Sequence, residues 1–231
     1  MKVQIWSDVV CPFCYIGKRK FEKALEGFAA KDKVEIEWKS FQLDPEMDNK
    51  NGLSVHEYLG KRKGGTTADG KRMNDGMAAI AKEVGLEFNF DEAIINNTVI
   101  AHQLLHFAKT RGIQNEMKER IFKAYYTEGK DVSNIDTLVG LAAELGLDVA
   151  ETKKVLEENV YANEVLADQE HAYQIGVQGV PFFVFNNKYA VSGAQQPEIF
   201  LQVLQKVWDE EKPALVAGGG EGFCNVDGVC N

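Results

Sequence analysis

Two cysteines near the start of the chain, Cys11 and Cys14, most constrain its fold. They come directly after an apolar run with strand character, residues 3–10. The segment after them has helical spacing, with apolar side chains at Phe21, Ala24, Leu25 and Phe28. The pair is therefore expected where a strand ends and a helix begins. Pro12 fits that position, because the first residue of a helix needs no backbone N–H.

A thiol at the start of a helix has a chemical consequence. Unpaired N–H groups and a partial positive charge stabilise a thiolate there, so the pKa of the cysteine is expected to fall. Cys11 is predicted to be the exposed nucleophile and Cys14 the buried resolving thiol of a redox pair. The alternative is half of a zinc site. Structural zinc takes four ligands, however, and the remaining cysteines, Cys224 and Cys230, lie on a distant tail.

The charge and length of the chain exclude some partners. Its 231 residues carry a formal net charge of -9, which disfavours nucleic acid and anionic membranes because neither offers countercharge. No apolar run is long enough to span a bilayer, and the few residues before Cys11 leave no room for a signal peptide. The protein is therefore expected in the cytoplasm, where close cysteine pairs are typically catalytic, redox-sensing or metal-binding.

The order of the predicted elements indicates the fold class. Residues 34–41 alternate between apolar and polar side chains, which is typical of a half-buried strand, and Pro45 ends that strand. Residues 182–185 are apolar throughout, and residues 189–191 return as a short strand before a last helix. The chain is predicted to be an α/β protein with a thioredoxin-like fold. A large all-α insertion is expected between its second strand and the strand that follows Pro181.

The insertion is predicted from groups of apolar side chains with helical spacing, and no strand is expected within it. One group is Met73, Met77, Ile80, Ala81 and Val84. Residues 64–67 are expected to form a loop, and Ser133 is expected to cap a later helix together with Asp136. The predicted domains are residues 1–50 with 177–212 for the thioredoxin-like part, 51–176 for the helical part, and 213–231 for a flexible tail.

The tail cysteines have two interpretations. Cys224 and Cys230 flank Asp227-Gly228, a turn pair, so they could close a small disulfide loop and act as a second redox pair. They could equally be two ordinary thiols without a function.

Two histidines, His102 and His106, are four residues apart on one predicted helix. They lack the glutamate of the H-E-x-x-H metal motif, so packing is favoured and no metal site is predicted. Asp8 either shares a proton with Cys14 or is a solvated turn acid.

Four aromatic residues lie near the cysteines or the end of the second strand. Trp6 and Phe41 are expected to fill the core, whereas Phe13 and Tyr15 are candidates for an apolar substrate surface.

The motifs together resemble one family. The sequence is similar to the DsbA-like branch of the thioredoxin superfamily, and within it to the cytoplasmic FrnE-type proteins. The matching segments are Ser7-Asp8-x-x-Cys11-Pro12-Phe13-Cys14, Phe41-Gln42-Leu43-Asp44-Pro45, Asn97-Thr98, Ala101-His102 and Gly176-Val177-x-Gly179-Val180-Pro181. The resemblance covers nearly the whole chain except the tail, and it implies a protein thiol–disulfide oxidoreductase.

The resemblance also implies roles for the segment around Pro181. The Val180–Pro181 peptide bond is expected to be cis and packed against the cysteines, and the Val180 backbone is expected to pair with a substrate strand. One residue departs from the strongly oxidising periplasmic members, which have histidine where this chain has Phe13. Phenylalanine cannot stabilise a thiolate as histidine can, so a less oxidising potential is expected.

These observations predict an oxidoreductase that exchanges disulfides with client proteins and is recycled by a small thiol or a thioredoxin-type protein. No cofactor is expected, with glutathione as the candidate co-substrate, and a homodimer is left open. The alternative is a glutathione-dependent isomerase or transferase of the hydroxychromene-carboxylate isomerase or kappa type. Those proteins resemble the chain in architecture but have a serine at the active turn. A non-enzymatic, redox-sensing chaperone is the third hypothesis.

Overall fold

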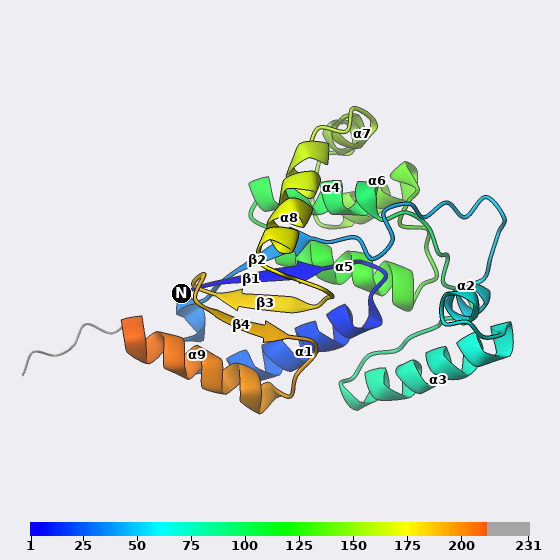
Figure 1. Ribbon diagram of the computed structural model, residues 1–231. Coiled ribbons are helices and arrows are strands. Elements are labelled where there is room, and N and C mark those ends of the chain that lie inside the picture. The colour runs from blue at the N-terminus through cyan, green and yellow to red at the C-terminus, as the bar shows by residue number, and fades with distance from the viewer. Residues whose placement is uncertain (212–231) are drawn as a thin grey trace, which may run out of the picture.

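The computed structural model describes residues 1–211 and is built around a four-stranded sheet (Figure 1). The strand order is β2-β1-β3-β4. β1 pairs in parallel with β2 and antiparallel with β3, which in turn pairs antiparallel with β4. The strands are β1 Lys2–Ser7, β2 Glu35–Ser40, β3 Phe182–Phe185 and β4 Tyr189–Ser192. The alternating residues of β2 and the apolar run of β3 form strands as the sequence predicts.

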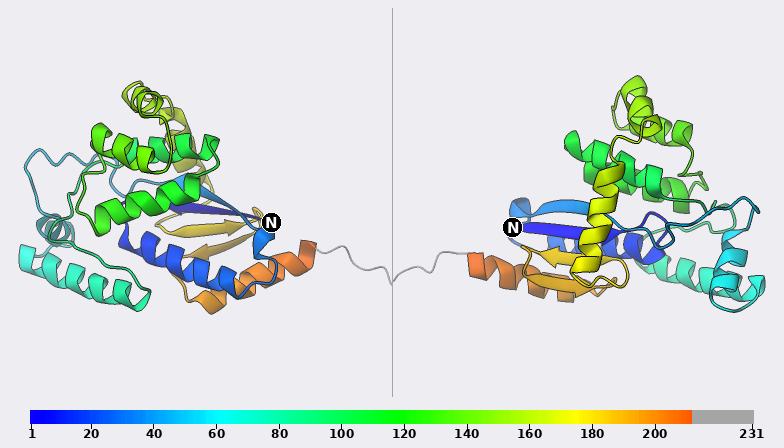
Figure 2. Two further views of the ribbon diagram at one scale, coloured as in Figure 1. Left: turned by 180° about the vertical axis from the view of Figure 1, so that it is seen from behind. Right: turned by 45° about the horizontal axis from the view of Figure 1, so that its top comes forward.

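Two helices, α1 Pro12–Glu26 and α9 Pro197–Glu211, cover one face of the sheet (Figures 1 and 2). Their apolar side chains meet those of the strands in one core. The rings of Phe21 and Phe183 lie 5.5 Å apart between centroids, and those of Phe183 and Phe200 lie 4.6 Å apart. A short 3-10 turn, η1 Lys31–Lys33, leads from α1 into β2.

All the other described helices lie between β2 and β3 in the chain, which confirms the predicted insertion. They are α2 Val55–Arg62, α3 Thr67–Glu83, α4 Val99–Thr110, α5 Gln114–Tyr126, α6 Ile135–Glu144, α7 Val149–Glu157 and α8 Ala162–Gln174. As expected, the insertion contributes no strand within the described residues. The predicted cap of α6 is wrong by one residue, because the side chain of Asn134, not Ser133, accepts the Thr137 N–H.

Helices α2 and α3 form a hairpin beyond the end of the sheet where β1 passes into α1 (Figure 2). Two glycines allow the hairpin to close. A Cβ at Gly70 would lie 1.9 Å from the carbonyl oxygen of His56, and a Cβ at Gly60 would lie 2.1 Å from that of Thr66. Thr66 and Asp69 cap α3, since the side chain of each accepts the backbone N–H of the other, and the helix begins at Thr67. The predicted loop, residues 64–67, is therefore one residue too long.

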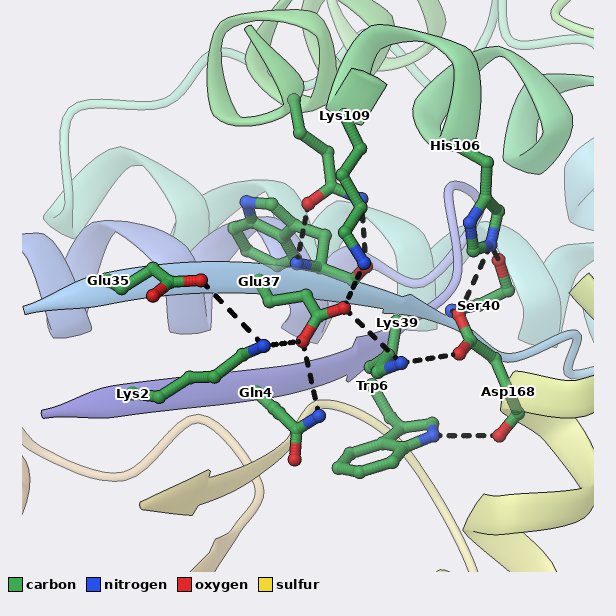
Figure 3. A network of polar contacts seen from close by, with 12 residues as sticks. Lys2, Gln4, Trp6, Glu35, Glu37, Lys39, Ser40, His106, Lys109 and Asp168 are labelled. Carbon is green, nitrogen blue, oxygen red and sulfur yellow. Dashed lines mark hydrogen bonds and ion pairs between the residues drawn. The ribbon is translucent and has the colours of Figure 1, made fainter. Parts of the chain in front are cut away.

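A polar network fixes the insertion to β2, one of the two edge strands of the sheet (Figure 3). Glu37, whose side chain is 5% exposed, binds Lys2, Lys39 and Lys109. Burial alone would raise the pKa of Glu37, but the hydrogen bonds from Lys109 and Lys2 outweigh burial and hold the pKa well below its ordinary value. The carboxylate is therefore an ionic link between the sheet and α4.

Asp168 of α8 makes a second link to the same strand. Its oxygens accept the Ser40 N–H at 2.8 Å and the Lys39 ammonium at 2.8 Å, and they lie 3.2 Å from Nε2 of His106 (Figure 3). Trp6 donates its indole N–H to the Asp168 backbone carbonyl at 2.9 Å. His106 thus has a structural role in this network, through Asp168 and the Ser40 hydroxyl. No cluster of three metal-ligating side chains occurs within residues 1–211.

Candidate active site

Cys11 and Cys14 lie at the junction that the sequence predicts. Cys11 is the N-cap of α1, Pro12 is the first helical residue, and the Cys14 N–H donates to the Cys11 carbonyl at 3.0 Å. Both are free thiols. Cys14 is fully buried as expected, but Cys11 is also only 4% exposed, so the prediction of an exposed nucleophile is wrong. Cys11 nevertheless borders a cleft, and it is the cysteine of the pair that does so.

The segment around Pro181 covers Cys11. The Val180–Pro181 peptide bond is cis, and the Cys11 thiol donates to the Val180 carbonyl with 3.4 Å between the sulfur and the oxygen. The Pro181 ring packs on α1, where a Cβ at Gly17 would come within 3.0 Å of its Cγ. The contact of the Val180 carbonyl with the Cys11 thiol contributes to the burial of Cys11. It also leaves the thiol next to a backbone group that a substrate strand could pair with.

The pKa of Cys11 does not fall as the helix start predicts. The hydrogen bond between its sulfur and that of Cys14 raises the pKa, burial raises it further, and the Cys14 backbone N–H acts in the opposite direction. The helix N-terminus is outweighed because the Cys14 N–H alone favours the thiolate and the Cys11 side chain has little contact with water. The two sulfurs therefore hold a proton between them tightly.

Asp8 is buried and acts as a structural anchor. Its carboxylate accepts the N–H groups of Val9 and Leu43, each at 2.7 Å, and lies 3.2 Å from Nε2 of His102. Burial would raise the pKa of Asp8, but the hydrogen bonds from His102 and Leu43 outweigh it and lower the pKa. Burial likewise lowers the pKa of His102. The interpretation of Asp8 as a solvated turn acid is wrong, and His102 serves this anchor.

The cleft beside Cys11 has a volume of about 690 Å³ and lies between the active turn and the α2–α3 hairpin. Apolar side chains dominate its walls, among them Met47, Leu59, Met73, Met77, Ile80 and Ile95. Phe13 is 45% exposed and also borders it. Trp6 and Phe41 are buried as predicted. Tyr15 belongs to the core as well, since its ring stacks on that of Phe122 with 4.7 Å between centroids.

Sequence reasoning missed a buried lysine near the sulfurs. Lys118 of α5 is 1% exposed, and its Nζ has no hydrogen-bond partner within residues 1–211. Burial lowers the pKa of Lys118 to about 8, although the charges of Cys14, Asp8 and Cys11 act to raise it. A signal was present in the sequence. Lys118 directly follows Met117 and precedes Ile121 by three residues, so it falls inside the apolar stripe of its helix.

The family follows from the comparison with known proteins. The sequence model described as "DSBA-like thioredoxin domain" matches residues 2–205, which is most of the chain. The chain belongs to this family. The DSBA-like chain is also 32% identical over 216 residues to the uncharacterized protein YwbO of Bacillus subtilis, a match that covers 91% of this chain and 97% of that protein.

Solved structures agree with the DSBA-like assignment. A probable DsbA oxidoreductase from Streptomyces coelicolor, SCO1869, is 37% identical, with a TM-score of 0.86 over 100% of this chain and 98% of that one. Two more distant structures share the fold alone. The cytosolic disulfide reductase DsbM of Pseudomonas aeruginosa, solved with GSH, is 18% identical, with a TM-score of 0.63 over 90% of this chain and 100% of its own. A 2-hydroxychromene-2-carboxylate isomerase is 13% identical, with a TM-score of 0.66 over 91% and 97% of the two chains.

The DSBA-like fold thus brings together the cysteine pair, the segment at Pro181 and an apolar cleft, three features from distant parts of the chain. Cys224 and Cys230 lie outside the described residues, so the second redox pair stays a prediction. Among residues 1–211, no helix has the length and apolar character needed to cross a membrane. The site has what thiol–disulfide exchange requires: one sulfur at a cleft and a second sulfur directly behind it.

Proposed function

We propose that this DSBA-like protein is a protein thiol–disulfide oxidoreductase that exchanges disulfides with client proteins through Cys11 and Cys14. The observation that carries the proposal is the position of the Cys11 sulfur, which borders the apolar cleft and contacts the Val180 carbonyl. A client segment in the cleft would have its backbone N–H groups near that carbonyl, and an apolar wall would receive its side chains. Pro181 has no N–H that could compete at the sulfurs.

The proposed exchange has two steps. The Cys11 thiolate attacks one sulfur of a client disulfide, so that a Cys11–client disulfide forms and the other client sulfur leaves as a thiolate. The Cys14 thiolate then attacks the Cys11 sulfur and releases the second client thiolate. The client is reduced by two electrons, and the Cys11–Cys14 disulfide holds the oxidised state. The reverse sequence oxidises a client dithiol. Glutathione or a thioredoxin-type protein would recycle the pair in the cytoplasm.

Trapping of mixed disulfides tests the proposal. Cys14→Ser should accumulate mixed disulfides with an oxidised client, because the second step is lost, whereas Cys11→Ser should abolish insulin reduction. The replacement of both Cys224 and Cys230 by serine keeps the tail out of the assay. A fully active Cys11→Ser protein would end the proposal. Client binding that depends on oxidation state without turnover would favour the chaperone hypothesis.

A glutathione-dependent isomerase or transferase is the second candidate. The basic side chains Arg62, Lys63 and Arg72 border the cleft, and such cations suit the carboxylates of glutathione. Against this candidate, both sulfurs of a redox pair are present where the isomerase and kappa types have a serine. Consumption of glutathione with an electrophile, without reduction of insulin, would favour this second function over the first.

A further inference from the structure

Lys118 is a cation without a counterion in contact. Its Nζ lies over two aromatic rings, 4.6 Å from the centroid of Phe122 and 5.4 Å from that of Trp38. No hydrogen-bond acceptor reaches it within the described residues. The neighbouring carboxylate of Glu119 is already occupied, since it binds Lys18 at 2.7 Å and accepts the Tyr15 hydroxyl at 2.5 Å. A buried ammonium of this kind is unfavourable unless a negative charge nearby offsets its loss of hydration.

The redox pair supplies the negative charge that most favours the ammonium of this lysine. Phe122, on which the ammonium rests, stacks on Tyr15, the residue after Cys14. The groups that favour the charge of Lys118 are Cys14 first, then Asp8 and Cys11. Lys18 of α1 opposes it, and Lys118 in turn lowers the pKa of His102 on α4. The Asp8 carboxylate already has hydrogen-bond partners in Val9, Leu43 and His102. A thiolate of the cysteine pair is therefore the negative charge that Lys118 can stabilise.

We infer that Lys118 is a positioning residue of the dithiol, which stabilises the thiolate of the reduced pair through space and gives up its proton when the disulfide forms. The inference rests on the proposed function, because it concerns the same sulfurs. Lys118 touches neither sulfur with a hydrogen bond, so it acts through its charge. Disulfide formation removes the thiolate that favours the ammonium. The pKa of Lys118, about 8 beside the reduced pair, must then decrease further.

The proton and the electrons balance with glutathione disulfide as the oxidant. The reduced pair starts with one thiol and one thiolate beside the ammonium of Lys118. The bond between the two glutathione sulfurs breaks, the Cys11–Cys14 bond forms, and two electrons pass to glutathione. Two glutathione thiols result, one with the proton of the remaining cysteine thiol and one with the proton of Lys118, which is left as a neutral amine.

The redox equilibrium with glutathione tests this inference. Lys118→Met removes the charge at similar length, and Tyr126→Phe is the matched control, since Tyr126 lies on the same helix, is fully buried and also has an unpartnered polar atom. Both changes are made with Cys224 and Cys230 replaced by serine. We expect Lys118→Met to shift the equilibrium constant toward the disulfide by about tenfold or more at pH 7. The reason is that loss of the cation should raise the pKa of the thiolate by about one unit, and one pKa unit corresponds to a tenfold change in the equilibrium constant. The control should stay within about twofold.

Two further readouts separate a charge effect from a packing effect. The ultraviolet absorbance of the thiolate should titrate at higher pH in Lys118→Met than in the unchanged protein. In the unchanged protein, the Cε signal of ¹³C-labelled Lys118 should titrate at lower pH in the disulfide form than in the dithiol form. The second readout needs no variant, so it holds if Lys118→Met does not fold.

The outcomes distinguish this inference from the proposed function. An unchanged equilibrium constant in a folded Lys118→Met protein, or a Lys118 titration that is the same in both redox states, overturns the role of the lysine. A Cys11–Cys14 pair that never exchanges with glutathione or insulin overturns the oxidoreductase itself.

Discussion

Replacing Lys118 by methionine should make the reduced protein more stable at neutral pH, although it impairs the redox pair. Burial lowers the pKa of the lysine from 10.5 to about 8. At about 1.4 kcal/mol per unit, that shift corresponds to roughly 3 kcal/mol of unfavourable free energy for the buried ammonium. The contacts with Trp38 and Phe122 offset part of it, about 1 kcal/mol for each ring. The expected gain in the free energy of unfolding is therefore about 1–2 kcal/mol.

The pH dependence of this gain has a definite sign. Below about pH 8 the lysine is protonated in both the folded and the unfolded protein, so the whole penalty is present. Between about pH 8 and 10.5 the unfolded chain binds the proton and the folded protein does not, so the unchanged protein gains stability as the pH rises. Methionine has no such proton. The advantage of Lys118→Met should thus be largest near pH 7 and should shrink toward pH 10.

Urea unfolding followed by tryptophan fluorescence measures the difference. Both proteins carry serine at Cys224 and Cys230 and are kept reduced, and the slope of free energy against urea must agree between them. A Lys118→Met protein that is less stable at pH 7 would show that the lysine contributes to packing more than its charge costs. A stability difference that stays constant from pH 7 to pH 10 would refute the assigned protonation behaviour.

Three further changes test the fold and the site. Gly70→Ala should destabilise by about 1–3 kcal/mol in thermal unfolding, because its Cβ collides with a carbonyl of α2, whereas Gly76→Ala in the same helix meets nothing within 4 Å and should stabilise by up to about 1 kcal/mol. Phe13→His should make the potential of the cysteine pair less negative in graded glutathione buffers, and no rise would defeat the explanation. Burial raises the pKa of Glu119, but its basic partners on α1 outweigh burial and lower the pKa to about 2. The stability lost in Glu119→Gln, about 1 kcal/mol, should therefore be complete above about pH 4.5 and should vanish as the pH falls through about 2.

Local patterns in the sequence carried the prediction of the thioredoxin core. The strand before Cys11 and the helix after it follow from side-chain periodicity, and Pro12 marks the first helical residue. The cis bond before Pro181 came from the family resemblance, since periodicity says nothing about peptide isomers. The error at the cap of α6 is a choice between two neighbouring capping residues, Ser133 and Asn134, which differ little in preference.

Features that depend on contacts between distant segments could not be predicted. The cleft is made by residues from the active turn, the α2–α3 hairpin and the segment before Pro181, and the hairpin itself closes through the close approach at Gly60 and Gly70. The family resemblance implied that the segment at Pro181 packs against the cysteines, but not that its Val180 carbonyl, more than 160 residues away in the chain, would leave Cys11 buried. The burial of Lys118 was not predicted, because a single lysine beside an apolar stripe is usually a surface residue whose stem covers the border of that stripe.

The position of Lys118 suggests that the helical insertion does more than complete the cleft. The cysteines lie at the start of α1 and the ring of Trp38 comes from β2, but the cation comes from α5. The start of α5 fixes that ring, because the side chain of Gln114 accepts the Trp38 N–H at 3.0 Å and donates to the Trp38 carbonyl at 2.9 Å. Asn115 accepts the indole N–H of the same tryptophan at 3.0 Å. These reciprocal hydrogen bonds set the distance from the sheet to α5, and hence the field that Lys118 exerts at the sulfurs. Sequence changes confined to the insertion can therefore alter the redox equilibrium of the pair while the active turn itself stays the same.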